Sequence, residues 1–308
     1  MATTTSITTT YAGEFAGKYI SAALLSADTI EGGGITIKPN VKFKEVMKTL
    51  STDAIVKDAS CDFSDTSTIT LAEKILQPEE FQVNLELCKS DFVSDWEAIS
   101  MGYSAFDELP ANFADFLIGH VAAKVAQKTE QTIWTGAAAT AGEFNGFGAL
   151  LAADGDVVDV AGTSVTAANV ITEMGKVVDA IPTSVYGKED LYIYVPQNVA
   201  RAYVRALGGF GASGLGANGV ASQGTTWYNG GDLAFDGVKI FVASGMADNT
   251  MVAAQKSNLF FGTGLLADSN EVKLLDMSDL DGSQNVRVVM RYTAGVQIGI
   301  GADIVYYA

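Results

Sequence analysis

The 308-residue sequence has very few residues of the kinds that bind metals, form disulfides or act as catalytic bases. Its only cysteines are Cys61 and Cys88, and its only histidine is His120. Two cysteines are too few for a disulfide scaffold, and with one histidine they are too few for most zinc sites. Cys61 and Cys88 could pair if the fold brought them together, although free thiols are expected in a cytoplasmic protein. The fold must therefore be held together by packing.

Positive charge is also scarce, because 19 Lys and Arg residues stand against 36 Asp and Glu, which gives a formal net charge of -17. A chain with this charge repels phosphate, so direct sequence-specific DNA binding is disfavoured. No run approaches the about 18 apolar residues of a membrane span, and the opening MATTTSITTTYAGEFAGKYI is not of signal-peptide form. We therefore expect a protein made in a cytoplasm, with no membrane partner.

Apolar residues make up 48% of the sequence, which is enough for a substantial core. The first ten residues are rich in Thr, and EGGGITIKPN interrupts an extended segment with three glycines and a proline. Such a stretch buries little apolar surface. We predict that residues 1–45 form an arm and not a domain.

Two runs of strand character follow in TSTITLAEKILQPEEFQVNLELCKSDF, where QPEE separates them and Phe81, Val83, Leu85 and Leu87 alternate with polar residues. We interpret them as a long projecting β-hairpin that needs a neighbour to cover it, because an isolated hairpin is only marginally stable. Deleting residues 67–87 is then expected to leave the core folded. Lys74 is interpreted as a solvated charge that protects the strand edge from aggregation.

The segment LPANFADFLIGHVAAKVAQKTEQTIWTG predicts one long helix over residues 109–135. Its apolar residues fall largely on one side, Pro110 lies near its start and Gly136 follows its end. A helix of about 25 residues spans roughly 37 Å, more than most compact domains need. His120 lies within it, and no nucleophile with a matching acid is recognisable for a hydrolytic triad. We predict a structural histidine and no catalytic residue.

The middle of the chain has the pattern of an α/β layer. Helical spacing runs from Val170 to Ile181, the apolar run LYIYVP follows as a buried strand, and Pro196 opens another helix that ends at Gly208. FDGVKIFVAS then returns to strand. The last segment, QNVRVVMRYTAGVQIGIGADIVYYA, is either one very long strand or two strands joined by a bend. These elements together predict an α+β fold.

Two short motifs imitate ligand sites. GFGASG, residues 209–214, matches G-x-G-x-x-G, but a dinucleotide site needs a strand before it and a helix after it, and here a helix comes before and loop follows. In DMSDLDG, a calcium loop that began at Asp279 would place Met290 at the twelfth position, where a bidentate Glu is required. Asp276, Asp279 and Asp281 are therefore interpreted as an acidic turn. We predict no cofactor and no metal site.

The whole order of elements, from the arm through the hairpin, the long helix ending IWTG, LYIYVP, the glycine-rich loop and FDGVKIFVAS to the long last strand, resembles the major capsid proteins of tailed bacteriophages. The resemblance implies the HK97-like fold, with an N-terminal arm, an extended E-loop, a peripheral domain built on a spine helix, and an axial domain. The corresponding ranges are 1–45 for the arm, 46–90 for the E-loop region, 91–155 and 268–296 for the peripheral domain, and 156–267 and 297–308 for the axial domain.

This resemblance implies a structural protein that assembles as pentamers and hexamers into an icosahedral head around double-stranded DNA, which it contacts without sequence specificity. The expected partners are other copies of the chain, a portal protein, a separate scaffolding protein and decoration or head-fibre proteins. The expected location is the virion, assembled in the host cytoplasm. Some relatives form Lys to Asn crosslinks, but no Asn partner is identified for Lys74. Two alternatives remain: an encapsulin-type compartment that encloses enzymes, and a dinucleotide-binding oxidoreductase built on residues 209–214.

The glycine-rich loop that contains GFGASG buries little apolar surface against an ordering cost of about 1 to 2 kcal/mol per residue. We predict that it is mobile in an isolated subunit and differs between pentamers and hexamers.

Overall fold

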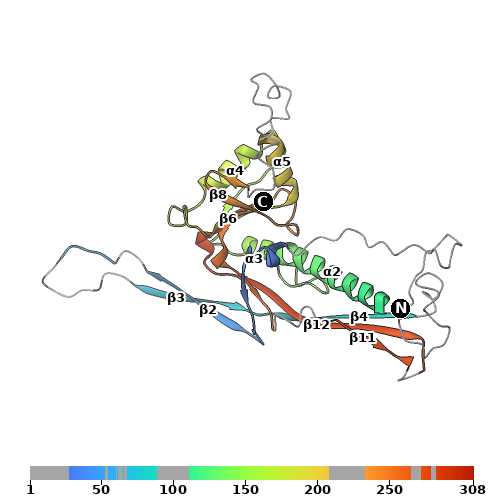
Figure 1. Ribbon diagram of the computed structural model, residues 1–308. Helices are drawn as coiled ribbons and strands as arrows, with labels where there is room; N and C mark the ends of the chain where they lie inside the picture. Colours follow the sequence, from blue (N-terminus) through green and yellow to red (C-terminus); the bar gives the residue numbers. More distant parts are fainter. Residues whose placement is uncertain are drawn as a thin grey trace, which may run out of the picture.

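A computed structural model describes most of the chain. The described residues are 28–52, 55–59, 61, 65, 68–88, 111–207, 233–264, 272–278 and 282–308. Two β-sheets, a two-stranded ribbon and one long helix dominate the arrangement (Figure 1). The ribbon and the lower sheet form one long strip, the long helix lies along the sheet, and the second sheet stands above their junction (Figure 1).

The lower sheet is built on one 14-residue strand, β12 (Asn285–Ile298). Its other strands are β1 (Thr36–Lys38), β10 (Leu259–Gly262), β11 (Val272–Asp276) and β4 (Glu79–Cys88). Both β10 and β11 pair with β12, and β4 pairs with it over ten positions, all antiparallel. Val286, Val288 and Met290 are buried, while Arg287 and Arg291 on the opposite face are exposed. This period of two fits a sheet that is covered on one side only.

The cover is α2 (Ala111–Thr135), a 25-residue helix that contacts β11 and β12. The helical period predicted it correctly, and Gly136 follows its last residue as expected. Its C-terminal turns carry Ile133 and Trp134, which are 0% and 2% exposed. These two side chains belong to a buried cluster that also contains residues of the lower sheet and of the second sheet.

The upper sheet has six strands in the order β5-β13-β9-β6-β8-β7. They span β5 (Val158–Val160), β6 (Leu191–Val195), β7 (Ala234–Phe235), β8 (Val238–Val242), β9 (Met251–Gln255) and β13 (Val305–Tyr307). Helices α4 (Val170–Asp179) and α5 (Gln197–Leu207) pack on one face, where Ile193 lies in their core. Tyr194 points to the other face, where its ring packs against Trp134 of α2. Trp134 in turn packs against Phe147 of α3 (Phe147–Ala153).

Short elements tie these layers together. α1 (Asp28–Glu31) precedes β1, and the 3-10 helix η2 (Lys256–Asn258) joins β9 to β10. The 3-10 helix η4 (Gly301–Asp303) joins β12 to β13. β12 runs unbroken from Asn285 to Ile298, so this stretch is the one very long strand that its sequence allowed, and the chain ends with the separate short strand β13 in the upper sheet. With four α-helices of seven or more residues and thirteen strands in the described residues, the fold is α+β, as predicted.

The predicted hairpin is wrong in its pairing. β3 (Ile69–Leu76) does not pair with β4; it pairs antiparallel with β2 (Glu45–Thr52) over eight positions and forms the projecting ribbon, while β4 belongs to the lower sheet. The chain passes from β3 to β4 through Gln77 and Pro78 without turning back. Alternation identifies a strand and its faces but not its partner, and QPEE contains no glycine of the kind that tight hairpins favour. Deleting residues 67–87 would also remove β4, so that deletion is expected to unfold the lower sheet.

Candidate subunit interface

The ribbon has one apolar face. Residues opposite each other in an antiparallel pair share a face, so the register divides the ribbon into two sets. One face carries the pairs Val46–Ile75, Lys48–Glu73, Leu50–Leu71 and Thr52–Ile69. The other face carries Glu45–Leu76, Met47–Lys74, Thr49–Ala72 and Ser51–Thr70. The first set, which we call the apolar face, therefore presents five large apolar side chains around one pair of opposite charges.

These side chains are exposed in the single chain: Leu50 is 61%, Ile69 62% and Leu71 71% exposed. Of the fourteen large apolar side chains that are exposed among the described residues, eight lie between Phe43 and Ile75. Scattered exposed apolar residues are ordinary, but a concentration on one element marks a binding surface. The ribbon is the strongest such surface in the described part of the chain.

The base of the ribbon is fixed to the rest of the molecule. Leu76 is fully buried and lies against Gly262, where a Cβ atom would come within 2.9 Å of the Leu76 Cδ2 atom. The side-chain amide of Gln297 donates a hydrogen bond of 2.9 Å to the carbonyl oxygen of Ile75. Lys74 forms an ion pair of 2.5 Å with Asp154 at the end of α3. The base of the ribbon is thus held to the rest of the chain by packing, a hydrogen bond and an ion pair.

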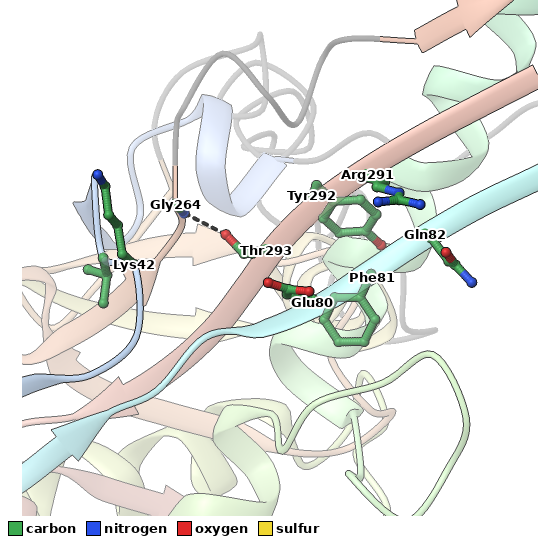
Figure 2. A pocket seen from close by; sticks show the side chains of 9 residues that line it. Lys42, Glu80, Phe81, Gln82, Gly264, Arg291, Tyr292 and Thr293 are labelled. Atoms are coloured by element: carbon green, nitrogen blue, oxygen red, sulfur yellow. Dashed lines mark hydrogen bonds between the residues drawn. The ribbon is translucent and has the colours of Figure 1, made fainter.

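A groove lies next to this base on the lower sheet (Figure 2). It has a volume of about 640 Å³. Its lining residues are Val41, Lys42, Glu80, Phe81, Gln82, Gly264, Arg291, Tyr292 and Thr293. Lys42 and Arg291 lie on opposite sides with Glu80 between them, and the Gly264 N–H donates to the Thr293 hydroxyl at 2.6 Å (Figure 2). Two cations at the rim suit an acidic partner segment.

A buried polar cluster holds the first described residues to α2. Glu130 is fully buried, and it accepts hydrogen bonds from the Thr29 N–H at 3.2 Å and the Thr29 hydroxyl at 2.5 Å. Trp134 Nε1–H donates to the same hydroxyl at 2.8 Å. Burial raises the pKa of Glu130, the hydrogen bonds from Thr29 and Gly245 act in the opposite direction, and nearby Asp28 raises it further. This cluster is a junction between the N-terminal segment, α2 and the upper sheet.

Sequence reasoning did not single out Glu130, Thr29 or Trp134. Thr29 and Glu130 are 101 residues apart, so no local pattern connects them. The position of Glu130, one helical turn before the buried Ile133 and Trp134, is the signal that could have identified it. A carboxylate on the buried side of a helix requires hydrogen-bond donors from elsewhere in the fold.

The residues that the sequence suggested for chemistry are not brought together. His120 is half-buried on α2. Asp276 accepts hydrogen bonds from the backbone N–H and the hydroxyl of Ser278, which forms a local turn. Asp279, Asp281 and residues 209–214 lie outside the described residues. Across the part of the chain that the structure describes, no group of three or more His, Cys, Asp or Glu side chains could hold a metal ion.

The two cysteines are not joined by a disulfide. Cys61 lies in the segment between β2 and β3, whereas Cys88 ends β4, so the extended course of β3 and β4 separates them. Lys74 also departs from its sequence interpretation, because it is not a solvated edge charge. Its partner, Asp154, is 80 residues away, and the ion pair with Lys74 lowers the pKa of Asp154 below its usual range.

None of the described helices is both long and apolar enough to cross a membrane.

Comparison with known proteins gives matches in structure only. No family model matches the sequence, and no curated protein is significantly similar to it. The structure is similar to the capsid of a native GTA particle, with 14% identity, a TM-score of 0.63 and coverage of 94% of this chain and 93% of that chain. It is similar to the capsid of Myoviridae phage XM1, with 13% identity, a TM-score of 0.59 and 94% coverage of both chains.

A structure from Mycobacterium phage Adephagia matches with 16% identity, a TM-score of 0.58 and coverage of 94% of this chain and 91% of that chain. These identities are low, but each match extends over nearly the whole of both chains. The chain therefore has the α+β fold of these phage and GTA structures.

Proposed function

We propose that this protein is the major capsid protein of a tailed bacteriophage, and that it assembles as pentamers and hexamers into an icosahedral head enclosing double-stranded DNA. The observation that carries the proposal is the ribbon with an exposed apolar face on a chain of capsid fold. A projection of this kind is costly in a monomer, since its apolar side chains stay in water. It is expected in a subunit whose neighbours cover it.

The elements correspond to the parts of an HK97-like subunit. The ribbon of β2 and β3, from Glu45 to Leu76, would be the E-loop, which is shorter than the expected range 46–90 because β4 belongs to the lower sheet. α2 would be the spine helix of the peripheral domain, together with β4, β11 and β12. The upper sheet with α4 and α5 would be the axial domain. We place β1 and β10 with the peripheral domain, because β10 pairs with β12 and β1 pairs with β10.

The partners follow from this assignment. Most contacts would be to other copies of the chain, since closed shells use repeated symmetric contacts. A portal protein, a separate scaffolding protein and packaged DNA, contacted without sequence readout, complete the proposed set. The negative net charge suits a container wall that must not bind its DNA tightly. The protein would have a structural and not an enzymatic role in the virion.

The apolar face can be tested with two matched variants. The substitutions Leu50→Lys and Leu71→Glu place an opposite-charge pair on the apolar face, and Thr49→Lys with Ala72→Glu place the same pair on the other face, one position along. Both leave the net charge unchanged and keep a favourable cross-strand pair. The first variant is expected to stop particle formation, as seen by sedimentation and electron microscopy, because it buries charges between subunits.

The second variant is the control and should assemble far better than the first. If both variants assembled as well as the wild type, the apolar face of the ribbon would not be part of the subunit interface. The contents of wild-type particles separate a phage head from an encapsulin-type compartment: a head should be filled with DNA when packaging genes are present, whereas a compartment would hold an enzyme and no genome.

A further inference from the structure

Arginine is rare in this chain and occurs at two places only. The four arginines are Arg201 and Arg205 on α5, and Arg287 and Arg291 on β12. Residues 191–231, which include the whole of α5, contain none of the 36 Asp and Glu residues of the sequence. α5 is therefore a basic element in a chain whose net charge is -17.

The two arginines of α5 lie on the side of the helix that faces away from the upper sheet. α5 buries Val199, Ala202 and Tyr203 in the core that it shares with this sheet. Arg201 and Arg205 are four residues apart, on the opposite side of the helix, and both are exposed. Side chains at this spacing have Cβ atoms about 5 to 6 Å apart. The two guanidinium groups therefore form a short positive stripe on the outer face of α5.

The charge of this stripe is not neutralised by the part of the chain that the structure describes. Neither Arg201 nor Arg205 forms an ion pair with a described residue. Arg201 donates a hydrogen bond of 3.2 Å to the side-chain oxygen of Gln197, a neutral amide that orients the guanidinium group and leaves its charge in place. On α4, which packs beside α5, Glu173 is already paired with Lys176 at 2.7 Å. The stripe is thus available to an anionic partner.

The chemistry of the stripe suits the phosphate groups of a nucleic-acid backbone. A guanidinium group is planar and weakly hydrated, and it can bind two phosphate oxygens at once. Each strand of double-stranded DNA carries a phosphate about every 3.4 Å along the axis, so two cations about 6 Å apart can contact one strand together. Carboxylates nearby would repel that strand. Among the α-helices that the structure describes, α5 alone has a net positive charge, which makes it the best suited of them.

We propose that the outer face of α5 contacts the phosphate backbone of the packaged double-stranded DNA through Arg201 and Arg205. The contact carries no sequence information, because it involves phosphates and not bases. With two phosphate contacts in each copy, its affinity should fall roughly tenfold between about 50 and about 200 mM salt. The DNA is then held at many weak points of an otherwise acidic wall. The inference rests on the proposed function, because it requires DNA inside the shell.

Arginine modification with phenylglyoxal tests this contact in assembled heads of the full chain. Filled heads are compared with heads of the same preparation that have released their DNA, and peptide mass spectrometry measures the reaction at each arginine. Arg201 and Arg205 should react severalfold more slowly in filled heads, and this protection should weaken as salt is raised. Arg287 and Arg291 are the internal controls, whose rates should not depend on DNA. Equal rates at Arg201 and Arg205 in filled and emptied heads would overturn the DNA contact.

Two matched variants separate DNA binding from subunit contacts. Arg201→Gln with Arg205→Gln removes two positive charges from α5, and Lys188→Gln with Lys239→Gln removes two from exposed positions outside this helix. Both should form shells, and reconstructions of filled heads should show density joining DNA to α5 in the wild type and the lysine variant but not in the arginine variant. If only the arginine variant failed to form shells, α5 would be a subunit contact and the DNA contact would be overturned. Wild-type shells that never take up DNA would instead defeat the proposed function.

Discussion

Single residues decide how the N-terminal segment is held, and Glu130 is the most important of them. Its carboxyl group has no exposed surface and accepts hydrogen bonds from both the backbone and the side chain of Thr29. The Ser244 hydroxyl donates to Asp28 at 2.7 Å, which ties the same segment to the turn after β8. The buried cluster therefore joins three parts of the chain that are distant in sequence.

The protonation of Glu130 should affect stability with a definite sign. Burial is the largest cause that raises its pKa in the folded state. Its contribution is therefore fully present below the unfolded pKa near 4.5 and is lost as pH rises through the higher folded pKa. Each pKa unit between the two states corresponds to about 1.4 kcal/mol.

Urea unfolding of the wild type and of Glu130→Gln, followed from below the unfolded pKa near 4.5 up to neutral pH, measures the effect. The difference in unfolding free energy, wild type minus variant, should fall as pH rises, because Gln does not titrate. A difference that stays constant or rises with pH would contradict the assignment.

Gly245 should not tolerate a side chain. A Cβ atom there would overlap the backbone carbonyl oxygen of Glu130, a clash that the helix backbone cannot relieve by moving a side chain. Gly245→Ala is expected to destabilise the chain by about 1 to 3 kcal/mol or more, the usual range for overpacking. Gly155→Ala is the matched control, because nothing lies within 4 Å of its Cβ position. Thermal unfolding of both variants provides the comparison, and equal melting temperatures would show that α2 is not so closely packed.

At the scale of elements, the ribbon separates folding from assembly. Leu76 and Leu71 lie on the same strand, but Leu76 is 0% and Leu71 is 71% exposed. Leu76→Ala should cost about 2 to 5 kcal/mol of stability by leaving a cavity against Gly262. Leu71→Ala should leave the stability of the isolated subunit almost unchanged and weaken assembly. Denaturation and sedimentation of both variants measure the two effects, and a large stability loss in Leu71→Ala would mean that the ribbon is covered within its own chain.

Sequence periodicity predicted the helices better than the sheets. The apolar spacing of α2, α4 and α5 is local, so these helices were found close to their observed bounds. The partners of β3 and β4 are set by packing with distant segments, β2 and β12, which alternation cannot reveal. The same limit applies to Lys74, whose ion pair with Asp154 spans 80 residues.

For the whole molecule, the fold distributes its apolar surface unevenly. One core lies between the upper sheet and α4 and α5, and a second lies where that sheet meets α2, α3 and the lower sheet. The ribbon contributes Leu76 to the interior, whereas the large apolar residues of its apolar face are exposed: Val46, Leu50, Ile69, Leu71 and Ile75. The folded body thus carries a projection whose apolar face is exposed, as the proposed assembly would require. This shape became apparent only from long-range strand pairing, which local sequence patterns do not specify.

The most direct measurement is an electron cryomicroscopy reconstruction of particles formed when the chain is expressed together with the genes that flank its own. We predict closed icosahedral shells in which Val46, Leu50 and Leu71 of every ribbon are covered by another copy of the chain. Small discrete oligomers in place of shells, or shells in which these side chains remain exposed to solvent, would contradict the account.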